Sequence, residues 1–513
     1  MKRHTPLCTF RTFGCRLALL AFLFLCAAMS HAQGARPAAT GHARPVPAKS
    51  SPPTTVAALL VSDIHFEPFW DPEKAAQLDA APVTQWNAIL AAAPSSGREQ
   101  RFDALQQTCH ARGVDTSYPL LESSLQAMRG SAAGIRFVTV SGDLIAHAFD
   151  CKYRTLFPHS TADAYRTFVE KTIGYVVAEL NGISPGVPVF VALGNNDSDC
   201  GDYRLDARSE FLAATGRQIV EAVPAAERDS ALKTFAEGGY YSVPLPAPIR
   251  NARLLVLNDI FLSGKYTACS GKPNPGAADG QLAWLQQQLD EARAQKQNLW
   301  VMGHIPPGID AHASKARMID PCGGASPKMF LSNEKLADML TDHSGVVKLA
   351  LFAHTHMDEI RLLRAEPAAL SAAAPGRPTV EPGEIALKTV PSISPIDGNN
   401  PSFTIAQVDS ATATLVDYRV IAAANPSGSA WSEEYDYSRA YGEPSYSAAS
   451  VDRLLTRFAA DSNVQLAASQ NYLRSYLVGG GASALAPFWP QYVCTLTHHT
   501  AAAFGACACP VAH

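Results

Sequence analysis

Residues 136–147 read RFVTVSGDLIAH, an apolar run followed at once by a glycine, an aspartate and, four positions after the aspartate, a histidine. The apolar part, Arg136–Ser141, is short and bounded by polar residues, which is typical of a strand buried on both faces. Asp143 and His147 therefore stand just past the end of a predicted strand. In an open α/β sheet, this is the edge at which ligands bind.

The same arrangement recurs at four other places in the chain. The motifs that follow an apolar run are Ser62-Asp63-Ile64-His65, Gly194-Asn195-Asn196-Asp197, Gly303-His304-Ile305-Pro306-Pro307 and Ala353-His354-Thr355-His356. In extended chain, Asp-x-His and His-x-His place both side chains on one face, so both can point into one cleft. These nitrogen and oxygen ligands suit zinc, manganese or iron, and no cysteine lies in the motifs. One such motif is weak, but the five together predict a metal centre.

Strand and helix patterns alternate through most of the chain. Strands are predicted at 56–61, 136–141, 187–193, 253–258, 298–302, 347–352 and 385–390, and helices at 120–129, 162–180, 280–295 and 333–343. Residues 402–421 indicate a hairpin around Asp409-Ser410, and 450–500 indicate helices broken by the turn Gly479-Gly480-Gly481. No internal repeat is visible. The pattern predicts a layered α/β domain with a helical C-terminal extension.

The N-terminus has the composition of an export signal. Basic Lys2–Arg16 precede the apolar run Leu17–Met29, and Ser30-His31-Ala32 is a small-x-small cleavage site. The bulky side chains before Cys26 disfavour a lipoprotein anchor. We expect a signal peptide at 1–32 and a flexible linker at 33–55 that is rich in Pro, Ala, Ser and Gly. No later stretch is apolar and long enough to cross a membrane, so we expect the mature protein in the periplasm or the medium.

Charge and cysteine content narrow the possible functions. The chain carries a net charge of −4, and removal of the four basic residues of the signal leaves −8. This acidic balance argues against nucleic-acid binding. Three of the eleven cysteines fall in the signal, so an even number remains, which indicates disulfides in an oxidising compartment. Cys494 is expected to pair with Cys507 or Cys509, whereas the sequence indicates no partner for Cys109, Cys151 and Cys200.

The order and spacing of the five motifs, from Val56 to Asp417, resembles the calcineurin-like metallophosphoesterases. Within that superfamily the chain looks most like the acid sphingomyelinase-like phosphodiesterases and the endopolyphosphatases, because of His147, His304–Gly308 and Asn400–Phe403. The resemblance implies an α/β/β/α sandwich over 56–425 and a helical C-terminal subdomain at 426–513. It also implies a disulfide between Cys269 and Cys322. Two metal ions are implied, one held by Asp63, His65, Asp143 and His356, the other by Asp143, Asn195, His304 and His354.

Such a centre has a defined chemistry. Two divalent ions about 3.5–4 Å apart lower the pKa of a shared water and clamp phosphate oxygens. His147 is the candidate proton donor to the leaving group. Asn196 stands where the family usually has histidine; its amide can donate a hydrogen bond to phosphate but cannot deliver a proton. Purple acid phosphatases carry tyrosine at the position of Ala146, so we prefer zinc, with manganese or iron as alternatives.

These features predict an exported two-metal phosphodiesterase that acts on a small-molecule or lipid phosphodiester, as sphingomyelinases do. The alternative is a phosphoanhydride hydrolase acting on nucleotides or polyphosphate, although the net charge of −8 argues against a long polyanion. A non-catalytic binding module is a third hypothesis. It is disfavoured because all seven ligand positions are kept. The sequence does not indicate an oligomeric state.

Overall fold

The structure is a computed structural model that describes residues 54–316, 320–365, 383–479 and 485–509. The predicted signal peptide (1–32) lies outside these residues, as do all but two residues of the predicted linker (33–55) and two of the three glycines of the predicted turn at 479–481. The chain divides into two units, Met1–Pro52 and Pro53–His513, and the fold described below is that of the second unit.

Two six-stranded sheets form the centre of this unit. The strands of the first sheet, in spatial order, are β12 (Ser432–Asp436), β11 (Leu415–Ala422), β10 (Ser402–Asp409), β1 (Thr55–Val61), β2 (Ile135–Val140) and β3 (Val189–Val191). Those of the second are β4 (Tyr241–Pro244), β5 (Ala252–Val256), β6 (Asn298–Met302), β7 (Val347–Phe352), β9 (Glu384–Thr389) and β8 (Glu359–Arg364). Strands β1, β2 and β3 run parallel, and so do β5, β6 and β7. Their carboxyl ends carry the five motifs.

The two sheets pack against each other through large apolar side chains. Trp300 of β6 meets Phe137 of β2 edge to face, with ring centroids 5.6 Å apart, and donates its indole N–H to the carbonyl of Ala413. Trp300 and Phe137 are fully buried. Burial of such aromatic rings is a major source of stability, so the packing of these sheets fixes the mutual position of their strand ends.

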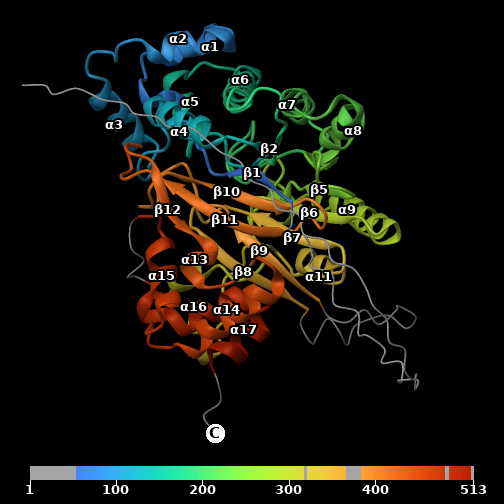
Figure 1. Cartoon of the computed structure of the whole chain (residues 1–513). Coiled ribbons are helices and arrows are strands. Elements are labelled where there is room, and N and C mark those ends of the chain that lie inside the picture. Colours follow the sequence, from blue (N-terminus) through green and yellow to red (C-terminus); the bar gives the residue numbers. More distant parts are fainter. Residues whose placement is uncertain (1–53, 317–319, 366–382, 480–484, 510–513) are drawn as a thin grey trace, which may run out of the picture. The chain divides into compact units, whose positions relative to one another are not determined.

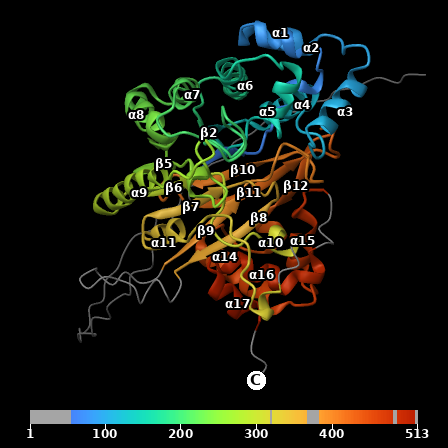
Figure 2. The same cartoon turned by 180° about the vertical axis from the view of Figure 1, so that it is seen from behind.

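Helices cover the outer faces of both sheets (Figures 1 and 2). The N-terminal half of the unit contributes α1 (Ala75–Ala80), α2 (Trp86–Ala91), α3 (Arg98–Thr108), α4 (Tyr118–Ser131), α5 (Phe149–Leu156), α6 (Ala162–Asn181), α7 (Glu210–Val220) and α8 (Arg228–Gly238). The rest are α9 (Pro275–Gln295), α10 (Ala311–Ala316), α11 (Lys335–Thr341), α13 (Tyr437–Tyr441), α14 (Ala448–Ala460), α15 (Ala467–Ser475), α16 (Trp489–Thr497) and α17 (Ala501–Ala508). Helix α4 contacts β10 of the first sheet, whereas α11, α14 and α16 contact β8 of the second. The predicted α/β sandwich is confirmed.

Most predicted elements are present, and the differences have physical causes. All seven predicted strands, the four predicted helices and the hairpin at 402–421 are confirmed, as are helices in the tail. Strands β4, β8 and β12 were not predicted. Strand β4 has only four residues, and charged residues hide the strand pattern of β8 and β12. Strand β12 lies beyond the predicted boundary at residue 425 and completes the first sheet beside β11. The division at 425 therefore stays a prediction.

Four disulfides link the eight cysteines beyond the predicted signal. They are Cys109–Cys151, Cys200–Cys269, Cys322–Cys509 and Cys494–Cys507. The expected pairing of Cys494 is confirmed, with Cys507 as its partner. The expected Cys269–Cys322 bond is wrong, because a short bridge between Arg204 and Thr267 brings the loops of Cys200 and Cys269 together. Cys322 instead ties its loop to the C-terminal helices.

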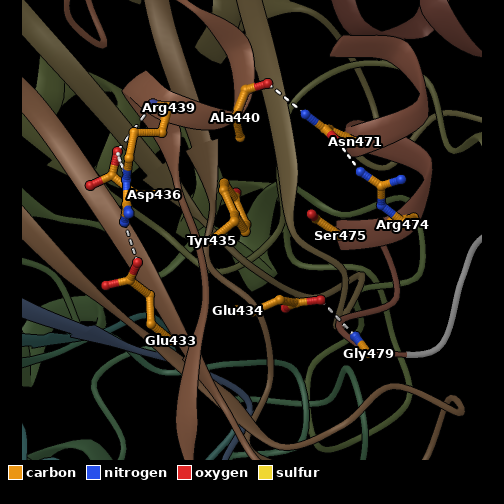
Figure 3. Close-up of a pocket in the computed structure, with 10 residues that line it drawn as sticks. All are labelled: Glu433, Glu434, Tyr435, Asp436, Arg439, Ala440, Asn471, Arg474, Ser475 and Gly479. Carbon is orange, nitrogen blue, oxygen red and sulfur yellow. Dashed lines mark hydrogen bonds and ion pairs between the residues drawn. The ribbon is translucent and has the colours of Figure 1, made fainter. Parts of the chain in front are cut away.

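No helix within the described residues has both the length and the apolar character needed to cross a membrane. A pocket of about 710 Å³ lies at the junction of β12, α13 and α15 (Figure 3). Its lining is mostly polar and charged, and includes Glu433, Glu434, Arg439 and Arg474. None of the predicted metal ligands lines this pocket, so its size does not mark it as the catalytic site.

Candidate metal centre

The seven predicted ligands come together where strands of the two sheets end. Asp63 and His65 follow β1, Asp143 follows β2, and Asn195 follows β3. The second sheet contributes His304 after β6, and His354 and His356 after β7. These side chains form two groups that share Asp143. The first group is Asp63, His65, Asp143 and His356, and the second group is Asp143, Asn195, His304 and His354.

In the first group the polar atoms converge on a common point. His65 Nε2 lies 3.2 Å from His356 Nε2 and 3.4 Å from Asp143 Oδ2. Asp63 Oδ1 lies 3.5 Å from His356 Nε2 and 3.9 Å from His65 Nε2. All four residues are buried.

The second group has the same geometry around His304. Its Nε2 atom lies 3.2 Å from Asp143 Oδ2, 3.1 Å from Asn195 Oδ1 and 3.3 Å from His354 Nδ1. The same oxygen of Asp143 thus faces both groups. A carboxylate in this position can bridge two cations.

The donor atoms fit a pair of divalent ions. Ligand atoms bound at 2.0–2.1 Å in a tetrahedron lie about 3.3 Å from one another, close to the spacings found in both groups. Both carboxylate oxygens of Asp63 are buried and have no hydrogen-bond partner. A buried ionised carboxylate without partners is costly, and a bound cation would satisfy it. His/Asp clusters able to hold a two-metal centre are therefore present.

The histidines are held by hydrogen bonds on the ring nitrogens that face away from the groups. His65 Nδ1 lies 3.0 Å from the carbonyl of Ile145, and His304 Nδ1 lies 2.8 Å from the carbonyl of Ser141. Each Nδ1–H donates to its carbonyl, so each Nε2 points into its group. Burial lowers the pKa of His304, but the charge of Asp143 outweighs burial and raises it to about 10, so a cation at the second group would replace the Nε2 proton of His304. Burial, with the charge of His147 second, lowers the pKa of His65 to about 3. His65 is thus neutral, as a metal ligand must be.

The backbone at the ligands differs from the extended chain that we expected. Asp63 and His65 both have φ of 45°, Asp143 has 55°, and His354 and His356 have 69° and 64°. Each is left-handed, a conformation that costs non-glycine residues free energy and that clusters at functional sites. The expectation that Asp-x-His and His-x-His converge through strand alternation is wrong. Left-handed turns at the strand ends bring these side chains together.

Two buried aspartates hold the motif loops in register. Asp197 accepts hydrogen bonds from the amides of Leu144, Ile145 and Gly194, which ties the second motif to the third. Asp259 accepts from the amides of His304 and Ile305 at 2.9 and 3.0 Å. Asp259 carries no motif signal in the sequence, and only the packing of its loop against β6 makes its position evident.

His147 lies beside the first group and is held by an aspartate that the sequence did not indicate. The His147 ring stacks on His65 with centroids 4.0 Å apart, and its side chain is 36% exposed. Its Nδ1 lies 3.1 and 3.2 Å from the two oxygens of buried Asp115, which also accepts from the His147 amide at 2.8 Å and from the Ser394 hydroxyl. Burial lowers the pKa of His147, but Asp115 outweighs burial and raises it to about 9. The ring is therefore a protonated donor near neutral pH.

Asn196 faces Asp143 rather than open space. Its side-chain Nδ2 donates to Asp143 Oδ2 at 2.9 Å, and its backbone N–H donates to Asp143 Oδ1 at the same distance. The neighbouring Asn195 Nδ2 donates to Asp202 at 2.7 Å, which directs Asn195 Oδ1 toward His304. We expected Asn196 to donate a hydrogen bond to phosphate. In this structure it instead donates to the shared carboxylate of Asp143.

The chain is similar in sequence to a family of known proteins. Residues 58–358 match the calcineurin-like phosphoesterase family. The chain is 26% identical over 359 residues to the human acid sphingomyelinase-like phosphodiesterase 3b, which covers 68% of this chain and 71% of that protein. It is 26% identical over 340 residues to the rat cyclic GMP-AMP phosphodiesterase SMPDL3A, which covers 64% and 67%. A dimetal phosphatase structure from Danio rerio aligns over 76% of this chain and 99% of that one, with 14% identity and a TM-score of 0.36.

Proposed function

The chain belongs to the calcineurin-like phosphoesterase family, as a metal-dependent hydrolase of phosphoric esters, and we propose that it is an exported two-metal phosphodiesterase. The observation that carries this proposal is the shared carboxylate of Asp143, whose Oδ2 faces ligand groups on both sides. The family match and the phosphodiesterase relatives set aside the hypothesis of a non-catalytic binding module.

In the proposed centre, the first group holds one ion and the second group holds the other. Zinc is the proposed metal, because four imidazoles and two carboxylates with one amide form a nitrogen and oxygen donor set without thiolate. When bound, two such metal ions act as Lewis acids toward the phosphate and supply a nucleophile at neutral pH. Asp143 and Asp63 balance the positive charge of the ions.

His147 and Asp115 together provide the proton that the leaving group takes up. His147 stands next to the first group with Nδ1 occupied by Asp115, so its Nε2–H is the donor left for the oxygen of the leaving group. Asp115 fixes the orientation of the ring and keeps it protonated. Its own pKa is raised by burial, but the charge of His147 outweighs burial and holds it below its usual range. Asp115 is thus a positioning residue for the proton donor.

The proposed substrate is a phosphodiester of the sphingomyelin type, with a small-molecule or lipid alcohol as leaving group. The similarity to a human acid sphingomyelinase-like phosphodiesterase supports this class. The second candidate is a nucleotide or another phosphoanhydride. The similarity to a rat cyclic GMP-AMP phosphodiesterase supports the nucleotide part of this candidate but not the phosphoanhydride bond, because the bonds of cyclic GMP-AMP are phosphodiesters. Export is supported by the four disulfides, which form and persist in oxidising compartments.

A substrate panel with purified holoenzyme tests the proposal. Bis-p-nitrophenyl phosphate, sphingomyelin, ATP and polyphosphate are compared at equal concentration, with Asp143→Asn as the inactive control. We expect hydrolysis of the phosphodiesters and loss of that hydrolysis in the control. Activity on ATP or polyphosphate alone would favour the second candidate. Hydrolysis of none of the four would reject both.

A further inference from the structure

Two loops form a covalently joined rim beside the second group. The disulfide Cys200–Cys269 links them, and the amide of Thr267 donates to the carbonyl of Tyr203 at 3.1 Å. The amide of Leu205 donates back to the carbonyl of Thr267 at 3.2 Å. Because these contacts pair the loops on both sides of Tyr203, the side chains between them have a fixed position relative to the metal ligands.

Tyr203 connects this rim to the second group. Its hydroxyl lies 3.1 Å from Nε2 of His354, and its ring meets the His354 ring edge to face. Its amide donates to the carbonyl of Asn195 at 2.9 Å. Tyr203 is only 7% exposed. It therefore contacts two residues of the second group from outside and holds His354 with Nδ1 turned toward His304.

Lys265 lies on the solvent side of Tyr203. Its Nζ is 3.3 Å from the Tyr203 hydroxyl and 4.6 Å from the centre of the ring, and its side chain is exposed. Within the described ranges, no carboxylate lies at ion-pair distance from this ammonium group. An ammonium group without an ion-paired carboxylate is held over an aromatic ring, two hydrogen bonds from the proposed metal ligand His354.

The positive charge of Lys265 is opposite in sign to the net charge of the chain. The residues beyond the predicted signal carry a net charge of −8, and Asp202 on the same rim is engaged by Asn195 Nδ2. Burial raises the pKa of Asp202, and the charge of Lys265 is a small opposing influence on it. Lys265 is thus an exposed positive group on the rim that forms no ion pair with the described rim acids, whereas Arg204 on the same rim donates to the carbonyl of Cys269. Cations at a phosphate site serve to bind further phosphate oxygens.

We propose that Lys265 binds a second phosphate group of the substrate, next to the phosphate held at the two-metal centre. The inference rests on the proposed function, because it takes the ligand groups as the site of the reacting phosphate. It deepens the second candidate of that function, a nucleotide or another phosphoanhydride, by assigning a residue that binds the additional phosphate of such a substrate. Lys265 also supports Tyr203, so the test must separate ligand binding from support of His354.

The test uses metal-loaded enzyme and two inhibitors that differ by one phosphate. AMP and α,β-methylene-ADP, whose bridging carbon resists hydrolysis, compete against bis-p-nitrophenyl phosphate in wild type, Lys265→Ala and Lys265→Arg. Lys272→Ala removes an exposed charge from the same loop and is the matched control. Binding of both nucleotides is also measured by calorimetry, and metal content is measured in every variant.

In the wild type we expect α,β-methylene-ADP to bind about tenfold or more tightly than AMP, as one charge-assisted hydrogen bond allows. Lys265→Ala should reduce that ratio to near one, whereas Lys265→Arg and Lys272→Ala should keep it. An unchanged ratio in Lys265→Ala, or no preference in the wild type, would overturn the proposal. An equal loss of both affinities together with metal would show that Lys265 only supports Tyr203. If bis-p-nitrophenyl phosphate is not hydrolysed, the proposed function fails, but calorimetry still decides the role of Lys265.

Discussion

Replacement of His147 by alanine tests the proton donor most sharply. The structure places its ring 4.0 Å from that of His65, with Nδ1 bonded to Asp115 at 3.1 Å and the side chain 36% exposed. The variant removes the donor but none of the seven proposed ligands. The variant also leaves buried Asp115 without its charge partner, so the free energy of unfolding is measured beside the rate, and the rates are compared below the temperature at which the variant begins to unfold.

The size of the effect depends on the leaving group. A p-nitrophenolate departs without a proton, whereas an alkoxide whose alcohol has a pKa near ~15 must be protonated as it leaves. General acid catalysis contributes roughly 10²–10⁴ in rate. His147→Ala should therefore slow an alkyl ester by about that factor and a p-nitrophenyl ester by less than about tenfold.

A matched pair of phosphocholine esters provides the assay. Glycerophosphocholine loses an alkoxide and p-nitrophenylphosphocholine loses p-nitrophenolate, so kcat/KM for the two is compared in wild type and variant. Asn196→His, added to His147→Ala, should recover part of the alkyl-ester rate, because it restores an imidazole where the family usually has one. An equal slowing of both esters would refute the reasoning, since His147 would then orient phosphate rather than donate a proton.

Three further changes have defined outcomes. Asp143→Asn removes the shared charge, so kcat should fall by about 10³ or more and bound metal should drop below two ions per chain by mass spectrometry, with an unchanged circular dichroism spectrum. Burial raises the pKa of Glu434 from 4.5 to about 7, so its contribution to stability is complete below pH 4.5 and is lost as pH rises through about 7. Between pH 5 and pH 8 this loss amounts to about 2 kcal/mol in the free energy of unfolding, measured with urea, and Glu434→Gln should remove it. An equal pH dependence in both proteins would contradict this expectation. Serine at both Cys322 and Cys509 opens a loop of 187 residues and should lower the free energy of unfolding by up to about 5 kcal/mol, whereas an unchanged urea midpoint would speak against this staple.

The sequence predicted the strands that carry the motifs because their signal is local. Strand β6 has the predicted bounds Asn298–Met302, because the polar residues on both sides of its apolar run mark where the buried strand begins and ends. Strand β8 was missed because Glu359 and Arg361 break its apolar pattern. The structure buries both, paired at 2.9 Å, and the Tyr492 hydroxyl donates to Glu359. Partners that lie far apart in the chain make such a strand possible, and no local pattern reveals them.

The sequence predicted which side chains lie together at the strand ends, but not the residues that support them. The motifs bring together all seven proposed ligands, because strand order and spacing constrain where strand ends meet. Asp115 lies 32 residues from His147, and Tyr203 lies 151 residues from His354. Neither Asp115 nor Tyr203 belongs to a sequence motif that would mark it. Their roles follow from loop packing, as does the Cys200–Cys269 bond that replaced the expected pairing.

The central claim is that two metal ions share Asp143. X-ray diffraction from crystals of the metal-loaded protein, with data collected on both sides of the zinc absorption edge, tests it directly. We expect two anomalous peaks, one inside the first group and one inside the second, with the Asp143 carboxylate between them. A single peak, or metal bound only at other residues, would contradict it.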